Sequence, residues 1–132
     1  MMIPADLDLS RLPARPRIDG ANYDWTGRLG DYPCLLNGHV ELKTDPETRA
    51  LMLDTRDWGS IEWDGARKGR AARYMDLARS MGDMLLVYVF EDIGRMDDPN
   101  AVPKRGSKRF TGLFRVVEFP QGGFLARLVK RD

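Results

Sequence analysis

One run of seven consecutive apolar residues, 84–90, constrains the fold of this chain more than any other feature. It follows Gly82-Asp83 and precedes Glu91-Asp92, so it is too short to cross a bilayer and ends too sharply for a long helix. β-Branched and aromatic residues fill its second half, and these favour a strand. We therefore predict a buried central strand over residues 82–90. Because it is apolar on both faces, the rest of the chain must cover both.

The length and the cysteine content indicate one domain without covalent staples. A chain of 132 residues buries roughly two thirds of its unfolded surface and needs neither a disulfide nor a metal for stability. Cys34 is the only cysteine and can form no internal disulfide. No apolar signal segment opens the sequence, so we expect a cytoplasmic protein that does not enter a membrane.

The net charge of +1 conceals an alternation of charged blocks. Residues 65–81 carry five basic and one acidic side chains, and residues 104–115 carry five basic and no acidic ones. The segments 34–64 (three basic, seven acidic) and 82–103 (one basic, five acidic) are acidic instead. Such blocks can pair within the fold or form opposed surface patches.

The pattern along the chain predicts an α+β fold, with an extended Pro- and Gly-rich arm over residues 1–33 and a single domain over 34–132. We expect one amphipathic helix over residues 66–81, because its apolar residues recur on one face and its basic residues on the other. This helix would lie across a curved, mainly antiparallel sheet or small open β-barrel. The expected strands are 34–42 (broken by a turn at Asn37-Gly38), 50–55, 60–64, the central strand, and a hairpin of 110–119 and 124–130 around the turn 120–123. Residues 92–108 are predicted to be a long loop.

Basic side chains with aromatic rings nearby are typical of nucleic-acid binding, because phosphates pair with Lys and Arg and unpaired bases stack on rings. Trp58 lies in a predicted turn beside Gly59, where a bulky ring is less obviously needed for the core. The predicted binding residues, from this turn, the helix and the basic end of the loop, are Trp58, Arg67, Arg70, Arg73, Lys104, Arg105, Lys108 and Arg109.

Catalytic chemistry has weaker signals. Cys34 and His39 would point to opposite faces of a strand, which disfavours a nucleophile and base pair. Asp31 with Glu41-Leu42-Lys43 resembles the Asp…Glu-x-Lys element of restriction-type nucleases, in which the acids hold magnesium and the lysine orients water. The sequence has no zinc-binding spacing and no glycine-rich phosphate loop. We expect no cofactor and no resident metal.

The segment 82–129 resembles the small barrels of the PUA-like superfamily, in particular its ASCH and EVE members. The resemblance lies in Gly82-Asp83 opening the apolar strand, a variable loop, and then Gly112 with alternating apolar residues before a returning strand. It implies binding of RNA or a modified base. It implies no particular pocket residues, because residues 1–64 contain no match to those of the family.

Three functional hypotheses follow. The first is a non-enzymatic module that binds RNA or modified or single-stranded DNA through the loop and the helix. The alternative is a protein-interaction or assembly subunit, with a protein partner or a second copy docked on residues 1–33. The third is a magnesium-dependent nuclease that uses Asp31, Glu41 and Lys43.

Overall fold

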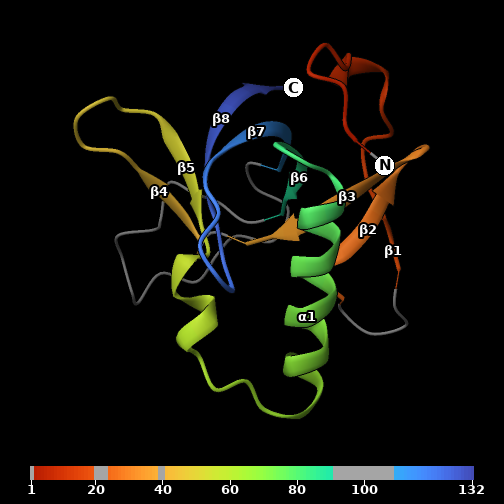
Figure 1. Cartoon of the computed structure of the whole chain (residues 1–132). Coiled ribbons are helices and arrows are strands. Elements are labelled where there is room, and N and C mark those ends of the chain that lie inside the picture. Colours follow the sequence, from red (N-terminus) through yellow and green to blue (C-terminus); the bar gives the residue numbers. More distant parts are fainter. Residues whose placement is uncertain (1, 20–23, 39–40, 91–108) are drawn as a thin grey trace.

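The structure is a computed structural model, which describes residues 2–19, 24–38, 41–90 and 109–132. It confirms the predicted fold class: one α-helix lies against a curved, open, eight-stranded sheet (Figure 1). The elements are η1 (Leu9–Arg11), β1 (Arg17–Ile18), β2 (Thr26–Leu29), β3 (Tyr32–Asn37), β4 (Leu42–Thr44), β5 (Leu51–Asp54), η2 (Arg56–Ser60), α1 (Gly65–Ser80), β6 (Met84–Val89), β7 (Phe110–Glu118) and β8 (Leu125–Arg131), where η marks a 3₁₀ helix.

The strands lie in the order β1-β2-β3-β6-β7-β8-β5-β4. Neighbours among the described strands run antiparallel except β3 and β6, which are parallel. The predicted hairpin is confirmed as β7 and β8. The sheet is therefore mixed, and β1 and β4 form its two open edges.

The central strand is confirmed as β6, which has β3 on one side and β7 on the other. All six of its residues are buried, and Leu85, Leu86, Val87 and Val89 are fully inaccessible. Phe90, the last residue of the apolar run, is 41 % exposed and lies outside the strand. Since side chains alternate across a strand, this burial shows that both faces of β6 are covered.

The helix is also confirmed, within one residue at each end. Ala71, Tyr74, Met75 and Ala78 form its buried face, and α1 packs against β3 and β2. Gly82, at φ +79°, supplies the left-handed residue that follows many helices and stops the helical path.

The described part of residues 1–33, predicted as an extended arm, is packed into the sheet and core of the domain. The second half of this segment contributes β1, β2 and the start of β3 to the sheet, and Ile3, Leu9 and Leu29 belong to the buried core. Gly27 permits the close approach of β1, since a Cβ there would lie 2.6 Å from the Arg17 carbonyl oxygen. The strands of this segment are too short, at two and four residues, to show an alternating pattern.

Two expected strands also differ. Residues 56–60 form η2 and residues 61–64 are irregular, so the predicted strand 60–64 is absent. Its apparent alternation arose because Trp63 packs on Trp58 rather than on a sheet, with the Trp63 indole N–H donating to the Trp58 carbonyl at 3.3 Å. The segment 34–42 does not form two adjacent strands, because β3 ends at Asn37 and β4 lies at the far edge.

Candidate nucleic-acid interface

Positive charge is concentrated on α1 and on the β7–β8 hairpin. Residues 65–80 and 109–132 together hold ten of the 21 Lys and Arg residues but only three of the 20 Asp and Glu residues. The other 92 residues therefore hold 11 basic and 17 acidic side chains. Two elements therefore carry net charges of +4 and +3, while the remainder of the sequence carries −6.

The exposed face of α1 is partly neutralised by ion pairs. Arg73 pairs with Asp24 at 2.5 Å, and Arg79 pairs with Asp76 at 3.3 Å. Arg67 and Lys68 are exposed, and no described acidic residue pairs with either. Of the helix residues predicted for binding, Arg67 is exposed and no described acidic residue neutralises it. Arg73 is neutralised by its ion pair with Asp24, and Arg70 is half-buried and has an interaction partner.

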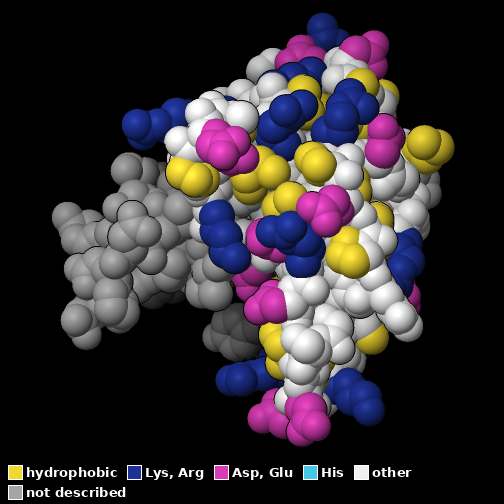
Figure 2. All heavy atoms as spheres, turned by 60° about the vertical axis from the view of Figure 1, so that its left-hand side comes forward, with side chains coloured by type: hydrophobic (Ala, Val, Ile, Leu, Met, Phe, Trp, Pro, Cys, Tyr) yellow, Lys and Arg dark blue, Asp and Glu magenta, His cyan; other side chains and the backbone are white. Residues whose placement is uncertain are grey.

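A second set of basic residues crosses the sheet surface. The strand registers place Lys43 opposite Met52, Met52 opposite Arg127, and Arg127 opposite Arg115, so these four side chains share one face. We call Lys43, Arg127 and Arg115 the basic row. Figure 2 shows Lys and Arg side chains on this side of the molecule, interspersed with apolar and acidic ones.

Within the basic row, Arg127 is the residue whose charge no described acidic residue neutralises. Arg115 pairs with Asp83 at 3.1 Å and Lys43 pairs with Asp54 at 3.4 Å. Arg127 is exposed and has no acidic partner in the described parts of the chain. Like charges directly opposite each other on neighbouring strands are destabilising, so the Arg115–Arg127 pair is unfavourable for the fold by itself.

The two basic elements meet at the turn of the hairpin. The Arg79 guanidinium carbon lies 5.9 Å from the centre of the Phe119 ring, and Tyr74 stacks on Phe124 with ring centres 6.1 Å apart. Phe119 is 40 % exposed. An aromatic ring is therefore accessible at the junction between the basic helix and the basic hairpin.

Trp58, which we predicted to stack on a base, lies in the core instead. It is 7 % exposed and its ring contacts those of Trp25, Trp63 and Tyr74 at centre distances of 4.7–5.4 Å. These rings meet at steep angles and close contact, which leaves no space for a base between them. Burying this ring, not binding a ligand, accounts for its place in η2.

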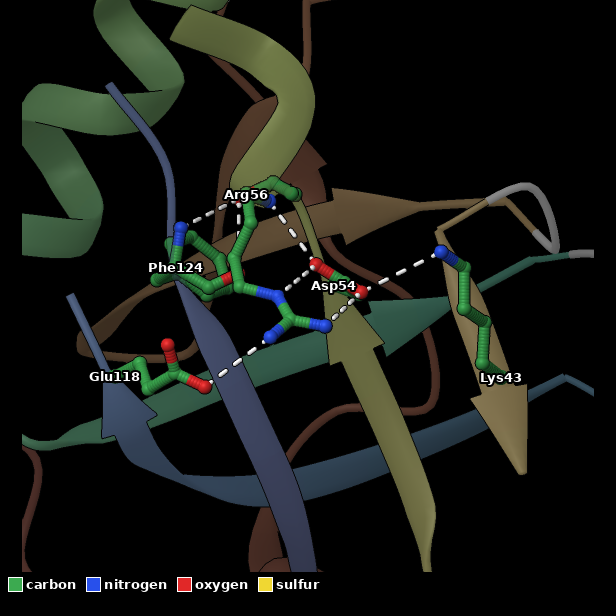
Figure 3. A network of polar contacts seen from close by, with 6 residues as sticks. Lys43, Asp54, Arg56, Glu118 and Phe124 are labelled. Carbon is green, nitrogen blue, oxygen red and sulfur yellow. Dashed lines mark hydrogen bonds and ion pairs between the residues drawn. The ribbon is translucent and has the colours of Figure 1, made fainter. Parts of the chain in front are cut away.

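An ion network fastens η2 to the sheet (Figure 3). Arg56 donates from Nε and from a terminal nitrogen to the two oxygens of Asp54, at 3.0 and 2.9 Å. Its other terminal nitrogen donates to Glu118 at 3.1 Å, and Lys43 approaches Asp54 from β4. Hydrogen bonds from the Arg56 side chain hold the pKa of Asp54 at about 2, against the opposing effect of burial. Asp54 is thus a fixed anion, not a proton-transfer group.

This network gives a pH-dependent stability. The folded pKa of Asp54, about 2, lies below the usual 3.8, so its stabilising contribution is full above pH 3.8 and is lost as the pH falls through 2. We expect Asp54→Asn to lower the free energy of unfolding by about 2 kcal/mol at neutral pH and to flatten its dependence on pH in that window. Urea unfolding at several pH values measures this. Glu118→Gln is the control, because removing a half-exposed partner should cost less than about 1 kcal/mol.

The nuclease residues are not brought together. Asp31 lies in the exposed turn between β2 and β3, whereas Lys43 lies in β4 at the opposite edge of the sheet, with Glu41 just before it. Within the described ranges, no group of three His, Cys, Asp or Glu residues could hold a metal ion. The magnesium nuclease is therefore not supported.

The remaining predicted residues are only partly described. Arg109, half-buried just before β7, has a buried Nε with no hydrogen-bond partner among the described residues. Burial raises the pKa of the Cys34 thiol to about 12, so it is no nucleophile at neutral pH. The predictions for Lys104, Arg105, Lys108, His39 and the loop 92–108 fall outside the described residues.

Sequence reasoning missed Arg115, Arg127 and Phe119 as interface candidates. Counting outward from the predicted turn at 120–123 places Arg115 opposite Leu128, and the register shift between Val116 and Glu118 brings Arg127 opposite it instead, so the sequence did not reveal this pair. No sequence signal marked Phe119, because its exposure depends on how α1 lies beside the hairpin.

No protein family model, curated protein or solved structure matches this chain. The PUA-like resemblance therefore stays a prediction. No helix in the described parts of the chain is long and apolar enough to cross a membrane.

Proposed function

We propose that this protein is a non-enzymatic nucleic-acid-binding module, whose ligand is RNA or single-stranded DNA. The observation that carries the proposal is the concentration of basic residues on two elements that touch each other, α1 and the β7–β8 hairpin. A polyanion that follows both elements meets the exposed side chains of Arg67, Lys68 and Arg127, which no described acidic residue neutralises.

The charges of the basic row also support the proposal. Arg127 lies opposite Arg115 across the hairpin, where like charges repel each other except as far as Asp83 neutralises Arg115. A phosphate placed between two such guanidinium groups would remove the repulsion and could accept hydrogen bonds from both.

Binding should weaken steeply with salt, because each Lys or Arg that contacts a phosphate releases condensed counterions. We expect the double variant Arg67→Ala with Lys68→Ala to make the slope of log affinity against log salt shallower by about 1.4, or 0.7 per lost contact to a single strand. Arg127→Ala should make it shallower by about 0.7. Fluorescence anisotropy with a labelled RNA or DNA strand measures the slope.

The matched control is Arg15→Ala with Arg17→Ala, which removes two exposed charges near the β1 edge, far from the hairpin in the strand order. Its slope should equal that of the unmodified protein. A protein that binds neither RNA nor DNA at low salt would rule out the proposed function, as would equal effects of the two double variants.

The alternative of a protein-interaction or assembly subunit has one structural observation in its favour. β1 is an open edge strand, its Ile18 is 46 % exposed, and unpaired edges are templates for pairing with another chain. A dimeric mass in solution that becomes monomeric with Ile18→Lys would favour this role over nucleic-acid binding.

A further inference from the structure

Two arginines of this protein lie over phenylalanine rings, in contrasting ways. Arg131 lies 4.0 Å from the centre of the Phe110 ring, and that ring is 2 % exposed. Arg79 lies 5.9 Å from the centre of the Phe119 ring, and that ring is 40 % exposed. In the first pair the arginine lies directly on a buried phenylalanine. In the second, which we call the open pair, the arginine is farther away and the phenylalanine is exposed to solvent.

The spacing of the open pair is close to that needed by a flat ring. Stacked aromatic layers lie about 3.5 Å apart, so a base between a guanidinium plane and a phenyl ring needs roughly 7 Å. The 5.9 Å between the guanidinium carbon and the ring centre is an upper limit on the separation of the two planes, so admitting a base requires an opening of at least about 1 Å. The Arg79 side chain is 51 % exposed and is held by one ion pair, to Asp76, so it can move by this amount.

The contacts of Phe119 and Arg79 with their neighbours indicate which of the two can move. The Phe119 ring also contacts Phe124 at 5.9 Å with a tilt of 57°, and Phe124 in turn stacks on the buried Tyr74. Phe119 is thus supported from beneath by the core, while Arg79 comes from the exposed face of α1. The Phe119 ring is therefore the fixed surface of the pair, and the Arg79 guanidinium group is the part that can move over it.

We propose that Phe119 and Arg79 form a stacking site for one unpaired base, which makes single strands, and not duplexes, the ligand of this protein. This role presupposes the backbone binding proposed above and specifies its substrate class. A paired base within a duplex is stacked on its neighbours and cannot enter, whereas each base of a single strand offers a free face that tolerates any sequence.

The test compares a single strand of about twelve uridines or thymidines with a duplex of equal length, a size within the range that one small domain covers. Phe119→Leu keeps an apolar side chain but loses the ring, and should weaken single-strand binding roughly 5- to 100-fold at an unchanged salt slope. Arg79→Lys keeps the charge but loses the planar guanidinium, and should weaken it by about 2- to 5-fold. Val117→Ala, at a 55 % exposed position of β7, is the matched control and should bind as the unmodified protein does.

The outcomes separate this site from the proposed function. A protein that binds neither probe contradicts both. A protein that binds the duplex as tightly as the single strand, or whose affinity is unchanged by both variants, keeps the backbone binding but overturns the stacking site. If Phe119→Leu alters the unfolding curve, the decision falls to Arg79→Lys, whose position is exposed and whose effect on the fold should be small.

Discussion

Gly123→Ala should lower the free energy of unfolding by at least about 3 kcal/mol or prevent folding, because a methyl group there has no space. Its Cβ would collide with the carbonyl oxygen of Thr55 and would lie 2.8 Å from the Cα of Arg56. Both obstacles are backbone atoms of one segment. That segment is tied to the hairpin by two hydrogen bonds, Thr55 N–H to the Phe124 carbonyl at 2.8 Å and Phe124 N–H to the Thr55 hydroxyl at 3.1 Å. Relieving the collision would break this tie.

The control is Gly69→Ala, in the middle of α1. A Cβ at Gly69 meets only the terminal nitrogen of Arg73, at 3.2 Å, and a long side chain can move away. Alanine favours the helix, so this variant should gain about 0.5–1 kcal/mol. Urea unfolding followed by tryptophan fluorescence suits both variants, since Trp58 and its neighbouring tryptophans lie next to the affected contact. Similar stabilities for the two variants would contradict the backbone contact.

How much of the fold could be predicted from the sequence depended on the length of each element, because a short element has too few residues to show a periodic pattern of apolar side chains. The helix and β6 were predictable because sixteen and six residues are enough to display one buried face or two. The hairpin was predictable because its turn residues are distinctive. β1 and β4, with two and three residues, exist only through their neighbours in the sheet, and no local pattern could identify them.

The candidate interface was predictable to the same limited extent. Arg67 was found because it begins the basic block 67–79, which is visible in the sequence. Arg127 required the hairpin register, which depends on bulges that shift the pairing of β7 with β8 near Leu113 and Val116. Phe119 required the position of α1 relative to the hairpin, which is set by tertiary packing. Trp58 was misplaced because a turn-like sequence beside Gly59 does not reveal that other rings close over it.

The same reasoning reverses the expectation for residues 1–33. Deleting residues 2–30 should unfold the protein, because the deletion removes β1 and β2 and uncovers β3, whose residues Cys34 and Leu35 are fully buried. It also removes Ile3, Leu9 and Leu29 from the core, and burying each such side chain contributes about 1.5–3 kcal/mol. The three side chains together contribute roughly 5–9 kcal/mol, which is comparable with the usual margin of about 5–15 kcal/mol before the loss of β1 and β2 is counted. Circular dichroism and thermal unfolding measure the outcome.

Two point variants separate a core role from an interface role of the same segment. Leu29→Ala, at a fully buried position of β2, should cost about 2–4 kcal/mol through lost burial and a cavity. Ile18→Ala, at the 46 % exposed edge position, should cost less than about 1 kcal/mol. If the truncated chain instead melts cooperatively near the temperature of the full protein, residues 2–30 lie outside the core. The segment would then fit the alternative hypothesis, in which a partner docks on residues 1–33.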